Sequence, residues 1–273
     1  FALPLLFTST LVLSVAIPTS SQAEFYDPRA QGGAMLDNAG SGGGEPLNVI
    51  ISGQSTPSVL TNSGFLGYAG ALGFAIECFG LHMGDPQQAN LGDGHGWVNQ
   101  SVELRQDYGS APLGTCWESI WGGNHLRVYR QDGNLANSGA LFLAVSKEEN
   151  VINHHTISPN GYNIGRDLLV QRAIGKTSFN GVRYTTTMRR IDGLMAPGSQ
   201  GCVAPGFVFL GVLPPSNLFG TASIMVGGPM REPLHPFTSD SGIATDGTVV
   251  LLTVICGMIP RGLVSLHLVF WDH

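Results

Sequence analysis

Two strand-like stretches joined by a polar connection constrain the fold of this chain most. Residues 124–130 alternate in character, so a strand puts His125 and Arg127 on one face and apolar side chains on the other. Residues 140–145 are apolar throughout, which predicts an interior strand. The connection 131–139 is rich in Asp, Asn and Gly, as β-hairpin connections are. We therefore expect a central hairpin.

Outside the central hairpin, the pattern of apolar and polar residues predicts more strands and two helices. Residues 102–105 fit either a strand or a helical turn, and Asn163 is a plausible N-cap for the second helix. The first helix is weakened by four glycines and could instead be a loop. Further strands are expected near 47–51, 151–157, 181–188 and 248–255, and helices near 58–74 and 164–174. The fold class predicted is α+β, a loop-rich antiparallel or mixed sheet with helices packed on one face.

Composition narrows the class of protein. Charged residues make up 12% of the chain, about half of the usual roughly 25%. The chain holds 38 glycines, which favours tight turns and long loops. The net charge of −6, without a basic stripe, argues against a nucleic-acid partner. No motif indicates a cofactor, and we expect none.

The N-terminal residues resemble a secretory signal. Residues 5–16 are apolar, and Ser21-Gln22-Ala23 fits a small-x-small cleavage pattern. The alternative is a membrane anchor, but the apolar stretch is short for a span of about 20 residues. We expect a signal peptide over 1–23, a secreted extracellular protein, and no stable membrane span after cleavage.

The mature chain divides by composition into three parts. Residues 24–46 contain glycine runs typical of a flexible lead-in. Residues 47–255 are expected to form a single globular domain. The tail 256–273 is either a removed lipid-anchor signal, which Arg261 argues against, or a strand with an extra segment.

Secretion makes the four cysteines interpretable as disulfides. Sequence alone does not choose among the three pairings. We prefer Cys78 with Cys116, because both lie beside the same loop-rich segment. Cys202 with Cys256 would follow, the alternative being two free buried thiols. Asn99 begins the one N-glycosylation sequon, which predicts a surface loop there.

The long polar loop 80–96 carries a weak metal signal. Its imidazoles and carboxylates are suitable ligands in kind, and the residues concerned are His82, Asp85, Asp93 and His95. The alternative is a glycine-rich surface loop whose Asp and His side chains cap turns.

The polar side chains of residues 121–175 are the candidates for catalysis. They are His125, Arg127, His155, Arg166 and Asp167. Arg166 is expected in the first turn of a helix, where a cation opposes the helix dipole. It should therefore have a partner, which is either an anionic ligand or a carboxylate that fixes the helix to the sheet.

Several of these motifs resemble a known family. They are an H-x-R strand (His125, Arg127), an apolar strand ending at Ser146, a His-x-Ile-x-Pro turn from His155 and an Arg-Asp pair (Arg166, Asp167). Together they resemble secreted fungal proteins similar to the LssY-type C-terminal domain, which in bacteria is often attached to a membrane phosphatase domain. The resemblance covers roughly residues 47–190 and implies no settled activity. The signatures of the phosphatase domain are absent from this sequence.

Two classes of function follow. The first is a ligand-binding or interaction module with an unknown extracellular ligand, in which the His, Arg and Asp residues form a buried structural network. The alternative is a secreted hydrolase of phosphate or sulfate esters, with His125 or His155 as base or nucleophile and Arg127 and Arg166 holding the anion.

Overall fold

The computed structural model describes residues 22–35, 44–80, 86–195 and 245–258. Its centre is the expected hairpin, which is confirmed. Strand β6 (Gly123–Asp132) pairs antiparallel with β7 (Asn137–Glu148), and Arg127 lies opposite Ala144. A polar turn closes the hairpin, as the Asp, Asn and Gly content predicted.

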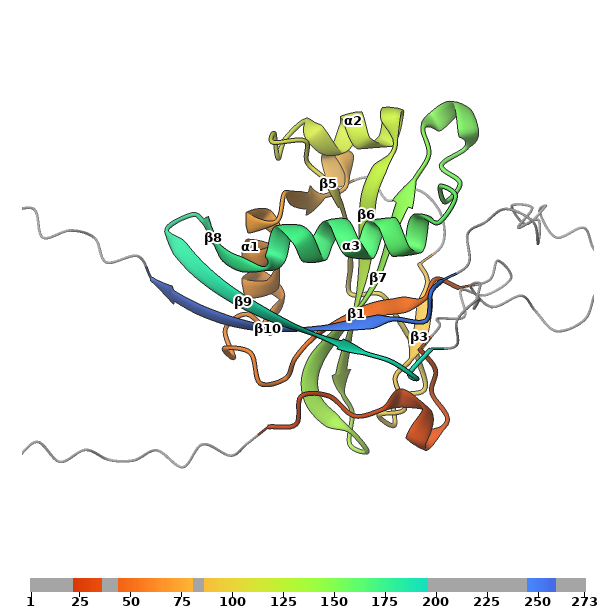
Figure 1. Cartoon of the computed structure of the whole chain (residues 1–273), viewed down its shortest axis with the longest axis vertical. Coiled ribbons are helices and arrows are strands. Elements are labelled where there is room, and N and C mark those ends of the chain that lie inside the picture. The colour runs from red at the N-terminus through yellow and green to blue at the C-terminus, as the bar shows by residue number, and fades with distance from the viewer. Residues whose placement is uncertain (1–21, 36–43, 81–85, 196–244, 259–273) are drawn as a thin grey trace, which may run out of the picture.

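The hairpin belongs to an eight-stranded curled sheet that resembles half of a barrel (Figure 1). The strand order is β2-β5-β6-β7-β1-β10-β9-β8, and only β1 and β10 run parallel. The remaining members are β1 (Leu47–Ile51), β2 (Phe74–Ile76), β5 (Val102–Gln106), β8 (Gly175–Phe179), β9 (Val182–Ile191) and β10 (Val249–Met258). A separate small sheet pairs β3 (Gln88–Asn90) with β4 (Trp97–Asn99).

The helices are short. They are α1 (Asn62–Ala71), α2 (Gly114–Trp121) and α3 (Gly161–Ala173), with 3-10 turns η1 (Pro28–Gln31), η2 (Cys78–Gly80) and η3 (Val151–Asn153). The α+β prediction is therefore wrong. The described chain is mostly β, a large curled sheet with three short helices. The prediction missed strands of three to five residues, which are too short to show a period of two.

Three local predictions also need correction. Residues 151–157 form η3 and turns in place of a third strand, and only an isolated bridge joins Ile157 to Glu148. The expected helix over 58–74 is shortened to α1, because Gly73 takes a left-handed conformation (φ 79°) before β2. Helix α3 begins three residues early, so Asn160 is its N-cap residue and Asn163 lies inside it.

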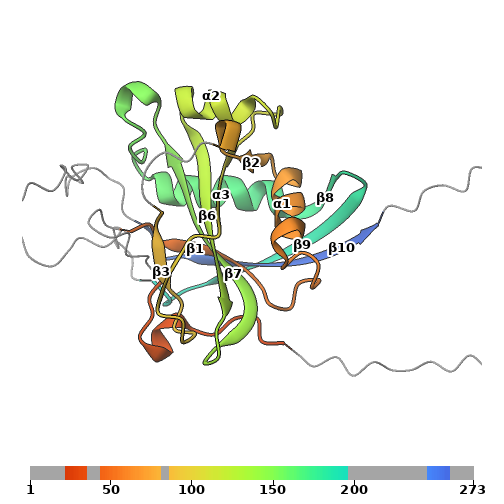
Figure 2. The same ribbon diagram turned by 180° about the vertical axis from the view of Figure 1, so that it is seen from behind.

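Apolar residues pack on both faces of the sheet. One face, covered by α1 and α3, buries strand residues such as Leu126 and Leu143 with Leu169 of α3. There α3 crosses β7 closely, since a Cβ on Gly165 would come within 2.5 Å of the carbonyl carbon of Ser146. The other face packs residues such as Phe142 against Met35 from the N-terminal segment. Figure 2 shows the sheet from behind.

Several predictions fall partly or wholly outside the described residues. The signal peptide over 1–23 is described only from Gln22, and the tail 256–273 only to Met258. The expected lead-in 24–46 is described except for 36–43, and it contributes η1 and a buried Glu45 to the fold. None of the helices described is both long and apolar enough to cross a membrane.

The cysteine prediction is confirmed for one pair. Cys78 and Cys116 form a disulfide that joins η2 to α2. Cys256 carries a half-buried free thiol, and Cys202 lies outside the described residues. Asn99 is exposed, but it lies in β4 and not in a loop.

Candidate functional site

The face of β5, β6 and β7 that carries His125 and Arg127 holds a buried network of charges. Strand alternation places Glu103 and Arg105 of β5 on the same face, and the register sets Glu103 opposite Arg127 and Arg105 opposite His125. Ser146 of β7 lies opposite His125 on the other side. The sheet thus presents acidic and basic side chains in adjacent rows.

Arg105 is the first centre of this network. Its guanidinium lies 2.8 Å from a carboxylate oxygen of Glu103, 3.0 Å from Glu118, 2.8 Å from Glu148 and 3.4 Å from Glu77. Burial disfavours the charged guanidinium, but these carboxylates outweigh it and raise the pKa of Arg105. The side chain is 12% exposed, so a planar cation is enclosed almost wholly by acids.

Arg127 and His125 form the second centre. Arg127 pairs with Glu45 and lies 3.1 Å from Glu103. The Nε2 atom of His125 is 3.2 Å from Glu45, and its Nδ1 is 3.2 Å from Glu148. Burial lowers the pKa of His125, but Glu148 and Glu45 outweigh it, so the pKa is raised. The imidazole is fully buried between two carboxylates.

The carboxylates of the network differ in their proton affinity. Burial raises the pKa values of Glu45 and Glu103, but the nearby cations outweigh it and hold both below the usual range. Glu118 of α2 differs, because burial raises its pKa to about 6 and Arg105 offsets only part of that. One oxygen of Glu118 bonds Arg105, and the other is buried without a hydrogen-bond partner.

The candidate residues do not converge. His125 and Arg127 lie together in the network, and His155 lies at its edge, one-third exposed, with Nδ1 3.7 Å from Glu148. Arg166 and Asp167 belong to a separate cluster on α3. A hollow between α1 and the sheet, lined by residues such as Asn62 and Arg130, contains none of the candidates.

Arg166 is explained by protein carboxylates. It is 1% exposed and donates to both carboxylate oxygens of Asp246, at 2.6 and 2.9 Å, and to the carbonyl of Thr248. Its Nε donates to Asp167. Hydrogen bonding to Arg166 lowers the pKa of Asp246 to about 2. Because α3 begins at Gly161, Arg166 lies in the second turn, and its role is to fix the helix to the start of β10.

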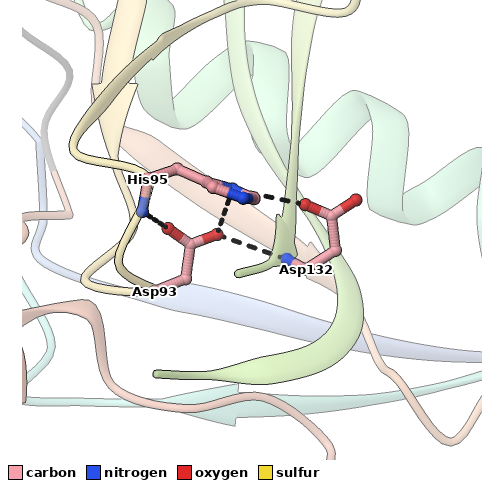
Figure 3. A group of neighbouring side chains, drawn as sticks. All are labelled: Asp93, His95 and Asp132. Atoms are coloured by element: carbon pink, nitrogen blue, oxygen red, sulfur yellow. Dashed lines mark hydrogen bonds and ion pairs between the residues drawn. The ribbon is translucent and has the colours of Figure 1, made fainter. Parts of the chain in front are cut away.

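The structure brings together two of the four residues of the predicted metal site. Asp93 and His95 lie beside Asp132, the last residue of β6, and ligand atoms of the three lie within 4.8 Å of one another (Figure 3). However, the buried Asp93 carboxylate also accepts hydrogen bonds from the backbone N–H groups of His95, Asp132 and Gly133. Capping the turn accounts for its position without an ion. His82 and Asp85 lie outside the described residues.

Sequence reasoning missed most members of the network. The alternation of apolar and charged residues in 102–105 could have predicted two members, because a strand there places Glu103 and Arg105 on one face. No sequence signal pointed to Glu45 or Glu118, because Glu45 precedes a strand and Glu118 lies on a helix that was not predicted.

Comparisons of the chain with protein-family models, curated proteins and solved structures found no match. The resemblance to the LssY-type domain stays a prediction.

Proposed function

We propose that this chain is a secreted, extracellular ligand-binding module that is not catalytic at its His and Arg residues. The observation that carries the proposal is the burial of His125 between Glu45 and Glu148, with Arg127 held by Glu45 and Glu103. The disulfide between Cys78 and Cys116 supports secretion, because disulfides persist in oxidising compartments.

The chemistry of a hydrolase would need different surroundings. A general base must reach the proton that it removes, and His125 is 0% exposed with both ring nitrogens facing carboxylates. An anion-binding arginine must have free donors, yet Arg127 and Arg166 are both held by acids. A phosphate or sulfate would be repelled by the five carboxylates around Arg105 and Arg127. Buried polar residues that satisfy one another are typical of a structural network.

The hydrolase alternative can be tested directly. The secreted protein is incubated with aryl phosphate and aryl sulfate esters, and its thermal unfolding is followed with phosphate, sulfate, sugars and divalent metals. We expect no turnover and no stabilisation by phosphate or sulfate, and His125→Gln should only lower the melting temperature. Ester turnover that is lost in a folded His125→Gln protein would overturn the proposal.

A further inference from the structure

Helix α2 is amphipathic, but its apolar side faces solvent and its polar side faces the protein interior. Its inward face buries Thr115 and the charged Glu118. Its outward face, at spacing i, i+4, i+7 and i+8, comprises Leu113 at the N-cap and then Trp117, Ile120 and Trp121, which are 40–61% exposed. A surface helix of a soluble domain normally turns its apolar stripe toward the core. Within the described part of the chain, the stripe therefore lacks the apolar partner that its composition requires.

Neighbouring segments extend this surface. Helix α2 contacts η2 and η3, and in Figures 1 and 2 the loop after β7 lies beside α2 at one end of the molecule. Of fifteen large apolar side chains exposed in the described part of the chain, nine belong to this end. We name them the apolar end: Ile76, Phe79, Tyr108, Leu113, Trp117, Ile120, Trp121, Val151 and Ile152.

The apolar end is large for a monomer. Its four aromatic side chains are 40–79% exposed, which leaves on the order of 400 Å² of aromatic surface in water. Five aliphatic side chains add to that area. The largest apolar patch on a typical monomer is about 300–600 Å² and is often functional. Trp121 contacts Trp117 and Tyr108, with ring centroids 5.6 and 6.2 Å apart, so three of the four aromatic side chains are in contact.

The apolar end is also held rigidly. The disulfide from Cys78 to Cys116 ties η2 to α2, next to Phe79. The backbone of Phe79 is left-handed (φ 53°), which is rare for a bulky residue, and its side chain is 79% exposed. Such strain persists where the surroundings impose it and is frequent at functional sites. A fixed surface loses little conformational entropy on binding.

Charge restricts the class of partner. The segments that carry the apolar end, residues 74–80, 108–123 and 148–159, contain no lysine or arginine, and the cations at their border are Lys147 and Arg172, which acts on Tyr108. The segments do contain Glu77 and Glu149, both partly exposed, above the acidic network. Anionic lipids attract basic clusters, and nucleic acids need them. These charges therefore disfavour a strongly anionic partner surface, whereas a neutral one meets no such repulsion.

Hydrogen-bonding capacity restricts it further. The outward stripe of α2 carries no hydroxyl, amide or carboxylate group, whereas sugar sites and protein interfaces place polar groups among their aromatic anchors. Trp and Tyr side chains are enriched where a membrane meets water, and helices with an outward apolar face lie in that interface. The strongly negative lipid surface belongs to the cytoplasmic leaflet.

We propose that the apolar end docks onto a neutral, zwitterionic phospholipid surface from the extracellular side. This inference rests on the proposed secretion and binding function, and it names the ligand class. Side chains of α2, η2 and η3 insert into the headgroup region, and none of the described helices crosses the bilayer.

The test is co-sedimentation of the full secreted chain with two kinds of vesicle, phosphatidylcholine alone and phosphatidylcholine mixed with phosphatidylserine. The chain should bind the first kind, gain nothing from phosphatidylserine and keep its binding at high salt. Ile120→Ser combined with Trp121→Ser should weaken binding about tenfold or more, because two apolar side chains that the lipid would bury on binding are lost. Phe79→Ser, a single change on a different element, should weaken it also.

The matched control is Leu135→Ser combined with Ile174→Ser, which removes two exposed aliphatic side chains outside the apolar end. It should bind as the wild type does, and thermal unfolding checks that each variant folds. Absence of vesicle binding, equal binding by all variants, or concentration-dependent dimerisation lost in Ile120→Ser/Trp121→Ser would each overturn the lipid proposal. The ester assays above are independent, so a failed vesicle test with no turnover rejects the lipid surface and leaves the non-catalytic function standing.

Discussion

Helices α3 and α2 place their charges and apolar residues in opposite ways. Helix α3 buries Leu169, Val170 and Ala173 against the sheet and uses one arginine, Arg166, to fix its start. Helix α2 buries Glu118 and exposes Trp117, Ile120 and Trp121, which would ordinarily supply the core. The apolar side chains of α3 stabilise the fold directly, whereas those of α2 gain nothing by facing water. The docking surface proposed above would account for this difference.

The two helices also differ in the charge that they neutralise. Arg166 of α3 meets two carboxylates that are about half exposed, so water also solvates this cluster. Glu118 of α2 is one of five carboxylates that share two arginines and a histidine, most of them buried. Burying a charge costs free energy that its partners must offset. The α2 network therefore holds an acid excess, and its protonation should affect stability.

The largest expected effect comes from removing the clamp of α3. Arg166→Ala removes both guanidinium hydrogen bonds to Asp246 and the one to the Thr248 carbonyl, and opens a cavity at a 1% exposed site. We expect a loss of about 3–5 kcal/mol in the free energy of unfolding, measured by urea denaturation. Arg172→Ala, at the other end of α3, is the control, and its guanidinium makes a hydrogen bond to a single carbonyl. Equal losses in the two variants would contradict the clamp.

The next effect concerns how α2 is held. Replacing Cys78 and Cys116 by alanine removes a cross-link between residues 38 positions apart, which should cost about 3–4 kcal/mol of unfolding free energy. Calorimetry of the oxidised protein and the double variant measures it. Replacing the free Cys256 by alanine should cost clearly less. If the double variant unfolds at the wild-type temperature, the remaining contacts alone hold α2 in place.

A third effect is pH-dependent and arises from Glu118. Its pKa is raised from 4.5 to about 6 in the folded state, so the folded protein binds more protons than the unfolded chain between these values. Stability should therefore fall by about 2 kcal/mol in total as the pH rises from below 4.5 to above 6, with most of the fall between these two values. The raised pKa of His125 continues the fall as the pH passes above 6.5, and the lowered pKa of Glu45 removes stability only in stronger acid.

Glu118→Gln isolates this effect. The variant should lack the fall between pH 4.5 and 6, whereas Glu149→Gln, next to the network, should retain it. Urea denaturation at a series of pH values gives both curves. A Glu118→Gln curve that parallels the wild type would show that another group causes the pH dependence.

The smallest effect separates the two helices most clearly. Ile120→Ser with Ile152→Ser changes side chains that are 51% and 81% exposed, and should alter the unfolding free energy by no more than about 0.5 kcal/mol. Leu169→Ala in α3 changes a side chain that is 1% exposed and should cost about 2–5 kcal/mol. A large loss of stability in the first variant would mean that the apolar end supports the fold.

Sequence patterns predicted the parts of the fold in which periodicity decides the structure. The central hairpin, β1 and β10 follow from apolar alternation or apolar runs of five or more residues, and β9 follows from its β-branched and aromatic content. The β8–β9 hairpin was missed, although Asn180-Gly181 takes positive φ at both positions, which is the signature of a type I′ turn. The strand predicted over 151–157 does not form, and its apolar residues Val151 and Ile152 face water from η3 and are not buried in the sheet.

The candidate site was predictable only in part, for a physical reason. His125 and Arg127 share a face because strand geometry requires it, but their partners come from segments far apart in the chain. Nothing in the local pattern of Glu45 or Glu118 tells which charge each will meet. The stripe of α2 has a period that is visible in the sequence, yet periodicity does not tell whether a stripe faces the core or the solvent.

The most direct test of the central claim is quenching of tryptophan fluorescence by phosphatidylcholine vesicles whose acyl chains are brominated. Trp117 and Trp121 of the apolar end should be quenched as the chain binds. Trp117→Phe/Trp121→Phe keeps the apolar character and retains Trp97 and Trp271, so it should still sediment with the vesicles but lose most of the quenching. Absence of quenching in the wild type, or undiminished quenching in this variant, would contradict docking through α2.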